Sequence, residues 1–377
     1  MDLKTLLRKL SPVVEPEGTV VTLTLDLSKS GILPPATRIF LKDQVLGNLL
    51  SEARSPAARP ALKKLARRIE AFAAREVEPG TNGLFLVAGR TVWEAVELQV
   101  PLRNFIHVGR TPYLAPLLEA AARAPRAYVV RLEPERAVIE EMHLGMCRLV
   151  KELAGGEILG RRSASKKTGY PGRGGAERDL RQRRNGEVAH ALIRAAASEI
   201  ARLDRDVEAV YFAGRREYLQ AFAEALPAGF RERCVPATDV APDLERLAAE
   251  RVEKEILEFH AQRERGLMAA LGPRDVLEHL YLGTVARVYL DAEDPIPGVV
   301  CTGCGSRAPG LVERCHFCGE GVVPTSITQA VVAHALANPP MALTFVPPRT
   351  GWLRDLDGMA ATLSARGARR KTAAAGR

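Results

Sequence analysis

The amino-acid sequence predicts a mixed α/β protein with three domains, of which the third carries a cysteine-rich insertion. Three observations indicate this arrangement. Segments whose apolar residues recur at helical spacing alternate along the chain with short strand-like runs. The chain has 377 residues, more than one ordinary domain holds. Four of its six cysteines form two closely spaced Cys-x-x-Cys pairs in the last third of the sequence.

The first domain is expected over residues 1–124. Its first helix places Leu3, Leu6, Leu7 and Leu10 on one face. The run 19–27 alternates apolar and polar residues, which predicts a half-buried strand. The other expected elements are helices at 36–50 and 61–74, strands at 83–88 and 92–98, and a helix at 112–122.

The second domain is expected over residues 125–272. A strand at 207–213 runs into Gly214 and a helix at 217–226, which is typical of a parallel α/β sheet. A long charged stretch, 244–271, reads as a helix that ends at Gly272–Pro273. The other expected elements are strands at 127–132 and 137–144, a basic loop at 160–184 and a helix at 187–203.

The third domain is expected over residues 273–365, with the cysteine insertion at 298–323. Helix 274–282 should end at Gly283, a residue that favours helix termination. The other expected elements are strands at 285–290 and 342–346 and a helix at 326–336. The Ala-, Gly- and Arg-rich tail at 366–377 is expected to be disordered.

The composition favours an anionic partner and gives no sign of a membrane segment. The net charge is +9 and the isoelectric point about 9.4. No apolar run approaches the roughly 20 residues of a membrane helix. The N-terminal residues lack the apolar core of a signal peptide. We therefore expect a cytoplasmic protein without a membrane partner.

The paired cysteines indicate a metal site. Cys301-Thr-Gly-Cys304 and Cys315-His-Phe-Cys318 are separated by ten residues, and a glycine follows each pair. In a cytoplasmic chain such pairs indicate metal binding rather than disulfides. Four thiolates complete a tetrahedral zinc and leave no position for a substrate, so we expect a structural zinc ribbon. A redox pair or an iron–sulfur site remains the alternative.

The basic loop at 160–184 is the other strong local signal. Its glycines and its proline disfavour a regular helix through its middle. Only Glu177 and Asp179 oppose its cations, so a phosphate backbone is the natural partner and a solvated linker is the alternative. The cations are Arg161, Arg162, Lys166, Lys167, Arg173, Arg178, Arg181, Arg183 and Arg184.

The segment Gly172-Arg173-Gly174-Gly175-Ala176 and the Arg-rich run after it resemble the catalytic loop of archaeal/eukaryotic-type class I translation release factors. That superfamily includes Pelota-like proteins. Further similar motifs follow in the same order: Val210-Tyr-Phe-Ala-Gly214, the run 275–283, the cysteine ribbon and the turn 357–361. The resemblance covers nearly the whole chain and implies three domains in release-factor-like order, beginning with a decoding-site-like α/β domain.

Two signatures of that family are missing from the sequence. The glutamine of the family's Gly-Gly-Gln falls on Ala176, whose methyl group cannot orient a water at an ester carbonyl. The stop-codon-reading Asn-Ile-Lys-Ser would fall near 51–60, where nothing similar occurs. In lacking both, the chain resembles the bacterial Balon-type ribosome hibernation factors.

The resemblance therefore implies a ribosome-binding factor that occupies the A site and silences translation without hydrolysing peptidyl-tRNA. We expect a monomer with no catalytic residue, and the resemblance leaves open a translational GTPase, such as elongation factor Tu, as a further partner. The expected contacts to ribosomal RNA are the nine loop cations above, together with Gly174, Gly175, Ala176, Arg54, Arg59, Lys63 and Lys64.

Two other functions stay open at this point. The first is a peptidyl-tRNA hydrolase or ribosome-rescue release factor, in which Glu177, Gln182 or ordered RNA would position the water. The second is another RNA-binding adaptor on the same scaffold.

Overall fold

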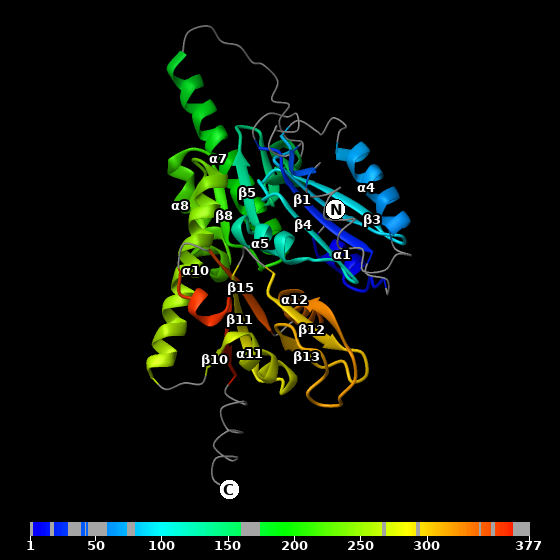
Figure 1. Ribbon diagram of the computed structural model, residues 1–377. Coiled ribbons are helices and arrows are strands. Elements are labelled where there is room, and N and C mark those ends of the chain that lie inside the picture. Colours follow the sequence, from blue (N-terminus) through cyan, green and yellow to red (C-terminus); the bar gives the residue numbers. More distant parts are fainter. Residues whose placement is uncertain are drawn as a thin grey trace. The chain divides into compact units, whose positions relative to one another are not determined.

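The computed structural model describes residues 3–15, 19–28, 39–41, 43, 59–73, 80–159, 174–265, 269–291, 295–338, 341–347 and 351–364. The side chains of residues 73 and 174–184 are not among the described parts. The chain divides into two compact units (Figure 1). Unit 1 contains residues 1–122 and 250–377, and unit 2 contains residues 123–249. The predicted mixed α/β class is confirmed, whereas the three domain boundaries remain a prediction.

The N-terminal part of unit 1 is an antiparallel sheet in the order β3-β2-β1-β4. Its strands are β1 (Val20–Asp26), β2 (Gly83–Ala88), β3 (Trp93–Leu98) and β4 (Phe105–Gly109). Helix α4 (Arg59–Ala73) packs Leu62, Ala66 and Ile69 against apolar residues of β1 and β2. The expected helix at 36–50 lies almost entirely outside the described residues.

The prediction that strand 19–27 would be half-buried is wrong. Every residue of β1 before Asp26 is buried, including Thr22 and Thr24. Thr24 Oγ1 donates to the carbonyl of Arg103 at 2.6 Å, and Thr22 Oγ1 accepts from the amide of Tyr113 at 2.9 Å. Threonine can occupy such a face because its hydroxyl finds a backbone partner there. The polar residues of the alternation thus mark a second buried face.

Unit 2 is built on a five-stranded sheet in the order β7-β6-β5-β8-β9. Strands β5, β8 and β9 are parallel, as the strand–Gly–helix step predicted, while β6 and β7 extend the sheet in antiparallel fashion. The sequence did not predict β7 or β9. The strands are β5 (Ala127–Leu132), β6 (Arg136–His143), β7 (Met146–Ala154), β8 (Ala209–Ala213) and β9 (Cys234–Pro236).

Helices on this sheet enclose the core of unit 2. Leu192, Ile193 and Ile200 of α7 (Gly174–Ile200) and Phe222 of α8 (Arg216–Ala225) are buried in one cluster with residues of β5, β6 and β8. The first part of α10 (Val240–Glu264) packs Leu244 against Tyr211 and its neighbours in a second cluster. The short helices are α6 (Gly155–Ile158) and α9 (Ala228–Arg231).

Helix α7 begins earlier than the sequence predicted. Its helical backbone starts at Gly174, whereas the glycine content predicts a loop through the middle of 160–184 and a long helix only from 187. Gly174, Gly175 and Ala176 therefore form the first turn of the helix. Glycine in the first turn costs little because those amides have no intrahelical partner and Arg-rich sequence with good helix propensity follows. Residues 160–173 lie outside the described part of the chain.

The C-terminal part of unit 1 holds a sheet in the order β10-β16-β11-β15 and a three-stranded ribbon, β13-β12-β14. The helices are α1 (Leu3–Leu10), α5 (Ala115–Arg123), α11 (Gly272–Tyr281) and α12 (Ile327–Ala337). The strands are β10 (Ala269–Leu271), β11 (Val285–Asp291), β15 (Ala342–Val346), β16 (Met359–Leu363), β12 (Pro297–Cys301), β13 (Arg307–Pro309) and β14 (Val322–Ser326).

The predicted helix 244–271 is wrong at its end, because α10 stops at Glu264 and residues 269–271 form strand β10. These three residues pair with β16, so an element distant in sequence overrides their helical propensity. The predicted end of α11 at Gly283 is confirmed by its left-handed φ of 64°. Within the ranges given above, none of the helices is long and apolar enough to span a bilayer.

Candidate metal centre and cationic surfaces

The ribbon brings the four paired cysteines together. The sulfur atoms of Cys301, Cys304, Cys315 and Cys318 all lie within 4.8 Å of one another. Cys301 is the last residue of β12, and the other three lie in the turns that β12, β13 and β14 support. The arrangement is compatible with a zinc site, as the spacing of the cysteines predicted.

In each Cys-x-x-Cys turn, backbone amides donate hydrogen bonds to the sulfur atom of the first cysteine. Backbone amides of Gly303 and Cys304 donate to Cys301 Sγ at 3.3 and 3.4 Å, and the amide of Phe317 donates to Cys315 Sγ at 3.4 Å. Such donors stabilise thiolates over thiols. The glycine after each pair adopts a left-handed φ, 72° at Gly305 and 75° at Gly319, which other residues adopt at a cost.

One of the four thiols is shifted toward the thiolate form that a metal requires. A hydrogen bond from the Ser306 hydroxyl, followed by backbone amides of the second turn, lowers the pKa of Cys315 to about 6. Four thiolates would complete a tetrahedral zinc, and no fifth position would be left for a substrate. His316 is exposed beside its cysteine neighbour. The donor set therefore suits a site that holds the ribbon together rather than a catalytic one.

The basic segment is only partly described. Arg161, Arg162, Lys166, Lys167 and Arg173 lie outside the described residues. The backbone of Gly174, Gly175 and Ala176 opens α7, and the same helix carries Arg178, Arg181, Arg183 and Arg184, whose side chains are not described. The first-turn amides of a helix favour anions. The described backbone therefore opens a helix at Gly174–Ala176, an end at which an anion is favoured.

Helix α4 carries the described part of the predicted RNA-binding set. Arg59, Lys63 and Lys64 are exposed, as is Arg67, which the sequence reasoning did not single out. We call these four residues the α4 stripe. Arg54 lies outside the described residues.

The α4 stripe is electrostatically unfavourable for the helix itself. Arg59, Lys63 and Arg67 follow one another at four-residue spacing, and like charges so placed repel. The first turn contains no acidic residue, so these cations begin at the positive end of the helix dipole. A polyanion would relieve both effects, which distinguishes the stripe from an ordinary mixed-charge surface.

One further feature near α4 had no signal in the sequence. The guanidinium carbon of Arg68 lies 3.8 Å from the centre of the Trp93 ring, and Phe72 contacts the same ring edge-on. Cation–π contacts of this kind fix the orientation of an arginine. The contact joins α4 to the edge strand β3, and only the folded pairing brings the two residues together.

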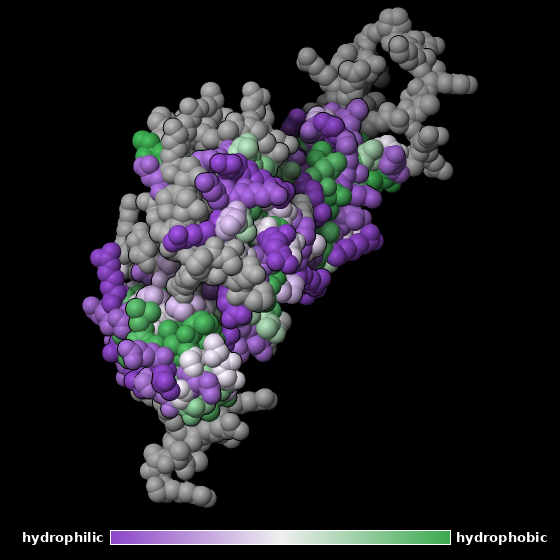
Figure 2. Space-filling model, turned by 45° about the vertical axis from the view of Figure 1, so that its right-hand side comes forward, coloured by the Kyte–Doolittle hydropathy of each residue, from purple (hydrophilic) through white to green (hydrophobic). Residues whose placement is uncertain are grey.

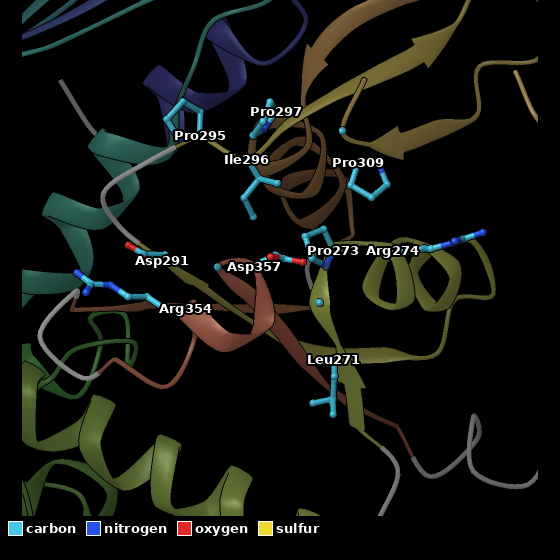
Figure 3. Close-up of a pocket in the computed structure, with 13 residues that line it drawn as sticks. Leu271, Pro273, Arg274, Asp291, Pro295, Ile296, Pro297, Pro309, Arg354 and Asp357 are labelled. Carbon is cyan, nitrogen blue, oxygen red and sulfur yellow. The ribbon is translucent and has the colours of Figure 1, made fainter. Parts of the chain in front are cut away.

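A cavity of about 610 Å³ lies in the C-terminal part of unit 1 (Figure 3). Its walls include Ile296 and several prolines, with Asp291 and Asp357 among the polar residues. Arg274 and Arg354 extend to opposite sides in Figure 3, so they do not form a two-arginine clamp for an anion.

Some apolar side chains are exposed at the surface of the described residues. Figure 2 shows a largely hydrophilic face with a hydrophobic patch on its lower part. Among the described residues, the large hydrophobic side chains with the greatest exposure are Phe317 at 83% and Leu311 at 82%, both in the ribbon.

Comparison with known proteins identifies the central part of the chain. Residues 112–263 match the family model of bacterial archaeo-eukaryotic release factor family 10. No curated protein matches the chain. Several solved structures match the chain at low sequence identity and with TM-scores under 0.5.

Three of these structures illustrate the range of sequence identity and coverage among the matches. The archaeal translation termination factor aRF1 is 15% identical, with 95% of this chain and 96% of that chain covered and a TM-score of 0.25. Dom34 of S. cerevisiae is 9% identical over 74% of this chain and 80% of its own, with a TM-score of 0.39. A chain in a model of ribosome-bound archaeal Pelota and ABCE1 is 13% identical. The match covers 96% of this chain and 94% of that chain, with a TM-score of 0.38.

The family match contains the basic segment, Ala176, helix α7 and the strand–Gly–helix step at Gly214, which carry the central part of the sequence resemblance. The other motifs, 275–283, the cysteine ribbon and 357–361, lie outside the matched residues. The resemblance is thereby confirmed at the level of the superfamily. Its Balon-type branch remains a prediction. The central segment of this chain, residues 112–263, is therefore similar to the bacterial archaeo-eukaryotic release factors of family 10.

Proposed function

We propose that this protein binds the ribosome, occupies the A site and silences translation without hydrolysing peptidyl-tRNA. The observation that supports the proposal is Ala176, which by the sequence resemblance falls at the position of the family's catalytic glutamine, inside the segment that matches the family model. A release factor without that amide keeps the body that enters the ribosome. It lacks the side chain that would orient the attacking water.

The basic segment 160–184 and the N-terminal domain would both contact ribosomal RNA. The basic residues of 160–184 would neutralise phosphates near the peptidyl-transferase centre, and the backbone at Gly174–Gly175 would allow close approach. The α4 stripe would lie against RNA near the decoding site. The absence of Asn-Ile-Lys-Ser around 51–60 suits a factor that does not depend on a stop codon.

A zinc ion would serve this function structurally. The four cysteines would hold it, and its chemistry there would be to fix the ribbon rather than to activate water. Delivery by a translational GTPase, such as elongation factor Tu, is part of the proposal because class I release factors work with such partners. Co-purification of the protein with that GTPase in its GTP form would test this step.

The main test is co-sedimentation of the full chain with vacant ribosomes at low salt. We expect binding that weakens steeply as salt rises, because phosphate contacts release counterions. The double variant Lys63→Glu/Lys64→Glu should weaken it. The matched control is Arg263→Glu/Arg265→Glu, which makes the same change in charge at two exposed residues at the C-terminal end of α10. This control should bind ribosomes as the unchanged protein does. Absence of binding at low salt would refute the proposal.

A second experiment separates occupancy from hydrolysis. The protein should release no peptide from stalled peptidyl-tRNA complexes, while Ala176→Gln should gain measurable release. Release by the unchanged protein that Glu177→Ala or Gln182→Ala abolishes would instead establish the hydrolase alternative. Binding to RNA without any binding to ribosomes would favour the adaptor alternative.

A further inference from the structure

The ribbon displays an aromatic side chain that its own fold does not use. Phe317 is 83% exposed although it lies between two cysteines of the metal centre. An exposed phenylalanine loses the burial that normally stabilises it. Its position therefore leaves the ring free to contact a partner outside the ribbon.

The backbone beneath Phe317 is held firmly. Arg314 pairs with Gly321 in a β-bridge, the Cys315 amide donates to the Glu320 carbonyl at 2.9 Å, and the Gly319 amide donates to the Cys315 carbonyl at 3.0 Å. The amide of Phe317 itself donates to Cys315 Sγ. A ring on such a closed hairpin loses little backbone freedom on binding, which favours affinity.

The two turns of the ribbon provide an internal comparison. Gly303 occupies the position in the first turn that Phe317 occupies in the second. A Cβ atom at Gly303 would approach the Glu320 side chain at 2.8 Å, so the first turn has little room for a side chain. Only the second turn projects a ring into solvent. The asymmetry shows that the metal-binding turn does not itself require an aromatic residue.

The neighbours of Phe317 indicate the chemistry of the partner. Arg314 and His316 are also exposed, so three planar side chains lie within four residues. Aromatic rings, imidazole and guanidinium planes are the groups on which unpaired RNA bases stack. Glu313 and Glu320 balance Arg307 and Arg314, so the ribbon offers stacking rather than a net positive charge.

We propose that the second turn of the ribbon is a stacking site for unpaired RNA bases, with Phe317 as its main platform and Arg314 and His316 beside it. An apolar pocket on a protein partner would favour any large apolar side chain, whereas a base requires a flat π surface. This inference does not depend on ribosome binding and is tested without ribosomes.

The test measures binding of a short fluorescent single-stranded oligoadenylate to the full chain by anisotropy over a series of salt concentrations. Phe317→Ala should weaken binding roughly 5- to 100-fold, the range of one base-stacking contact. The slope of affinity against salt should not change, because no phosphate contact is lost. Phe317→Trp should bind at least as well as the unchanged protein.

Leu311→Ala is the matched control, since Leu311 is 82% exposed in the same ribbon but presents no ring. It should leave binding unchanged, and all variants should keep their metal content. Unchanged binding by Phe317→Ala would overturn the proposal. Full binding by Phe317→Leu would overturn it as well, because that result would indicate an apolar contact of the kind a protein makes.

Discussion

The ribbon of unit 1 and the five-stranded sheet of unit 2 are both small β structures, yet they are stabilised in different ways. Val299 is the only large aliphatic residue of β12–β14 that is buried, and the buried Cys301 and Cys315 are two of the four candidate metal ligands. The sheet of unit 2 buries a continuous cluster of aliphatic and aromatic residues under α7 and α8. The ribbon should therefore depend on its metal, and the sheet on hydrophobic burial.

The largest expected effect tests this dependence directly. Cys315→Ser removes one of four ligands and should abolish metal binding, because structural zinc contributes on the order of 10 kcal/mol to such small domains. Residues 297–326 should then exchange their amides rapidly, while unit 2 stays protected. Elemental analysis and hydrogen exchange measure both effects. Cys147→Ser and Cys234→Ser, which lie outside the cluster, should retain the metal.

The core of unit 2 should respond in the opposite way. Phe222 is fully buried and stacks on Phe212 with ring centres 5.0 Å apart. Phe222→Ala should reduce the free energy of unfolding of unit 2 by about 3–5 kcal/mol and leave the metal content unchanged. Leu149→Ala, on the exposed side of strand β7, should change it by less than about 0.5 kcal/mol. Urea unfolding measures both. Equal effects of the two variants would contradict the proposed core.

The contrast between the cysteine-based ribbon and the apolar sheet also explains which elements the sequence could predict. Metal ligands are specified by local spacing, so the clustering of the four cysteines could be predicted from the sequence. Buried strands such as β2 and β5 are continuous apolar runs and were also predicted. Strand β7 was not predicted because most of it is exposed and a register shift opposite Ile139 and Glu140 interrupts its pairing.

Other elements depend on contacts that no local pattern reveals. The run 269–271 becomes a strand only because β16 pairs with it, and its alanines otherwise favour helix. Arg68 and Trp93 meet only across α4 and β3. The start of α7 at Gly174 has no clear local signal because a glycine-rich run disfavours helix, although the first turn of a helix tolerates glycine.

Acid should weaken unit 2 through one ion-pair network. Burial raises the pKa of Glu141, but hydrogen bonds from Arg126 at 2.8 Å and Arg148 at 2.5 Å outweigh it and hold the pKa below its usual value. The ionised carboxylate therefore stabilises the fold above its unfolded pKa of about 4.3, and this contribution is lost as pH falls through the lower folded value.

Glu141→Gln should remove that part of the acid dependence and reduce stability at neutral pH by about 1–2 kcal/mol. Urea unfolding at several pH values measures it. Glu152→Gln, in an ion pair in which both side chains are about half exposed, should leave the profile nearly unchanged. A profile for Glu141→Gln identical to that of the unchanged protein would show that the network contributes nothing.

The smallest expected effect on the stability of unit 2 comes from an exposed ion pair. Arg202 forms an ion pair with Glu199 at 2.8 Å, but its side chain is 70% exposed. Water and salt screen such a pair, and ordering the arginine costs conformational entropy. Arg202→Ala should therefore change the free energy of unfolding by less than about 0.5 kcal/mol. A larger loss would mean that surface charges, and not only the core under α7 and α8, stabilise unit 2. In that case the difference between a metal-dependent ribbon and a core-dependent sheet would need a third, electrostatic component.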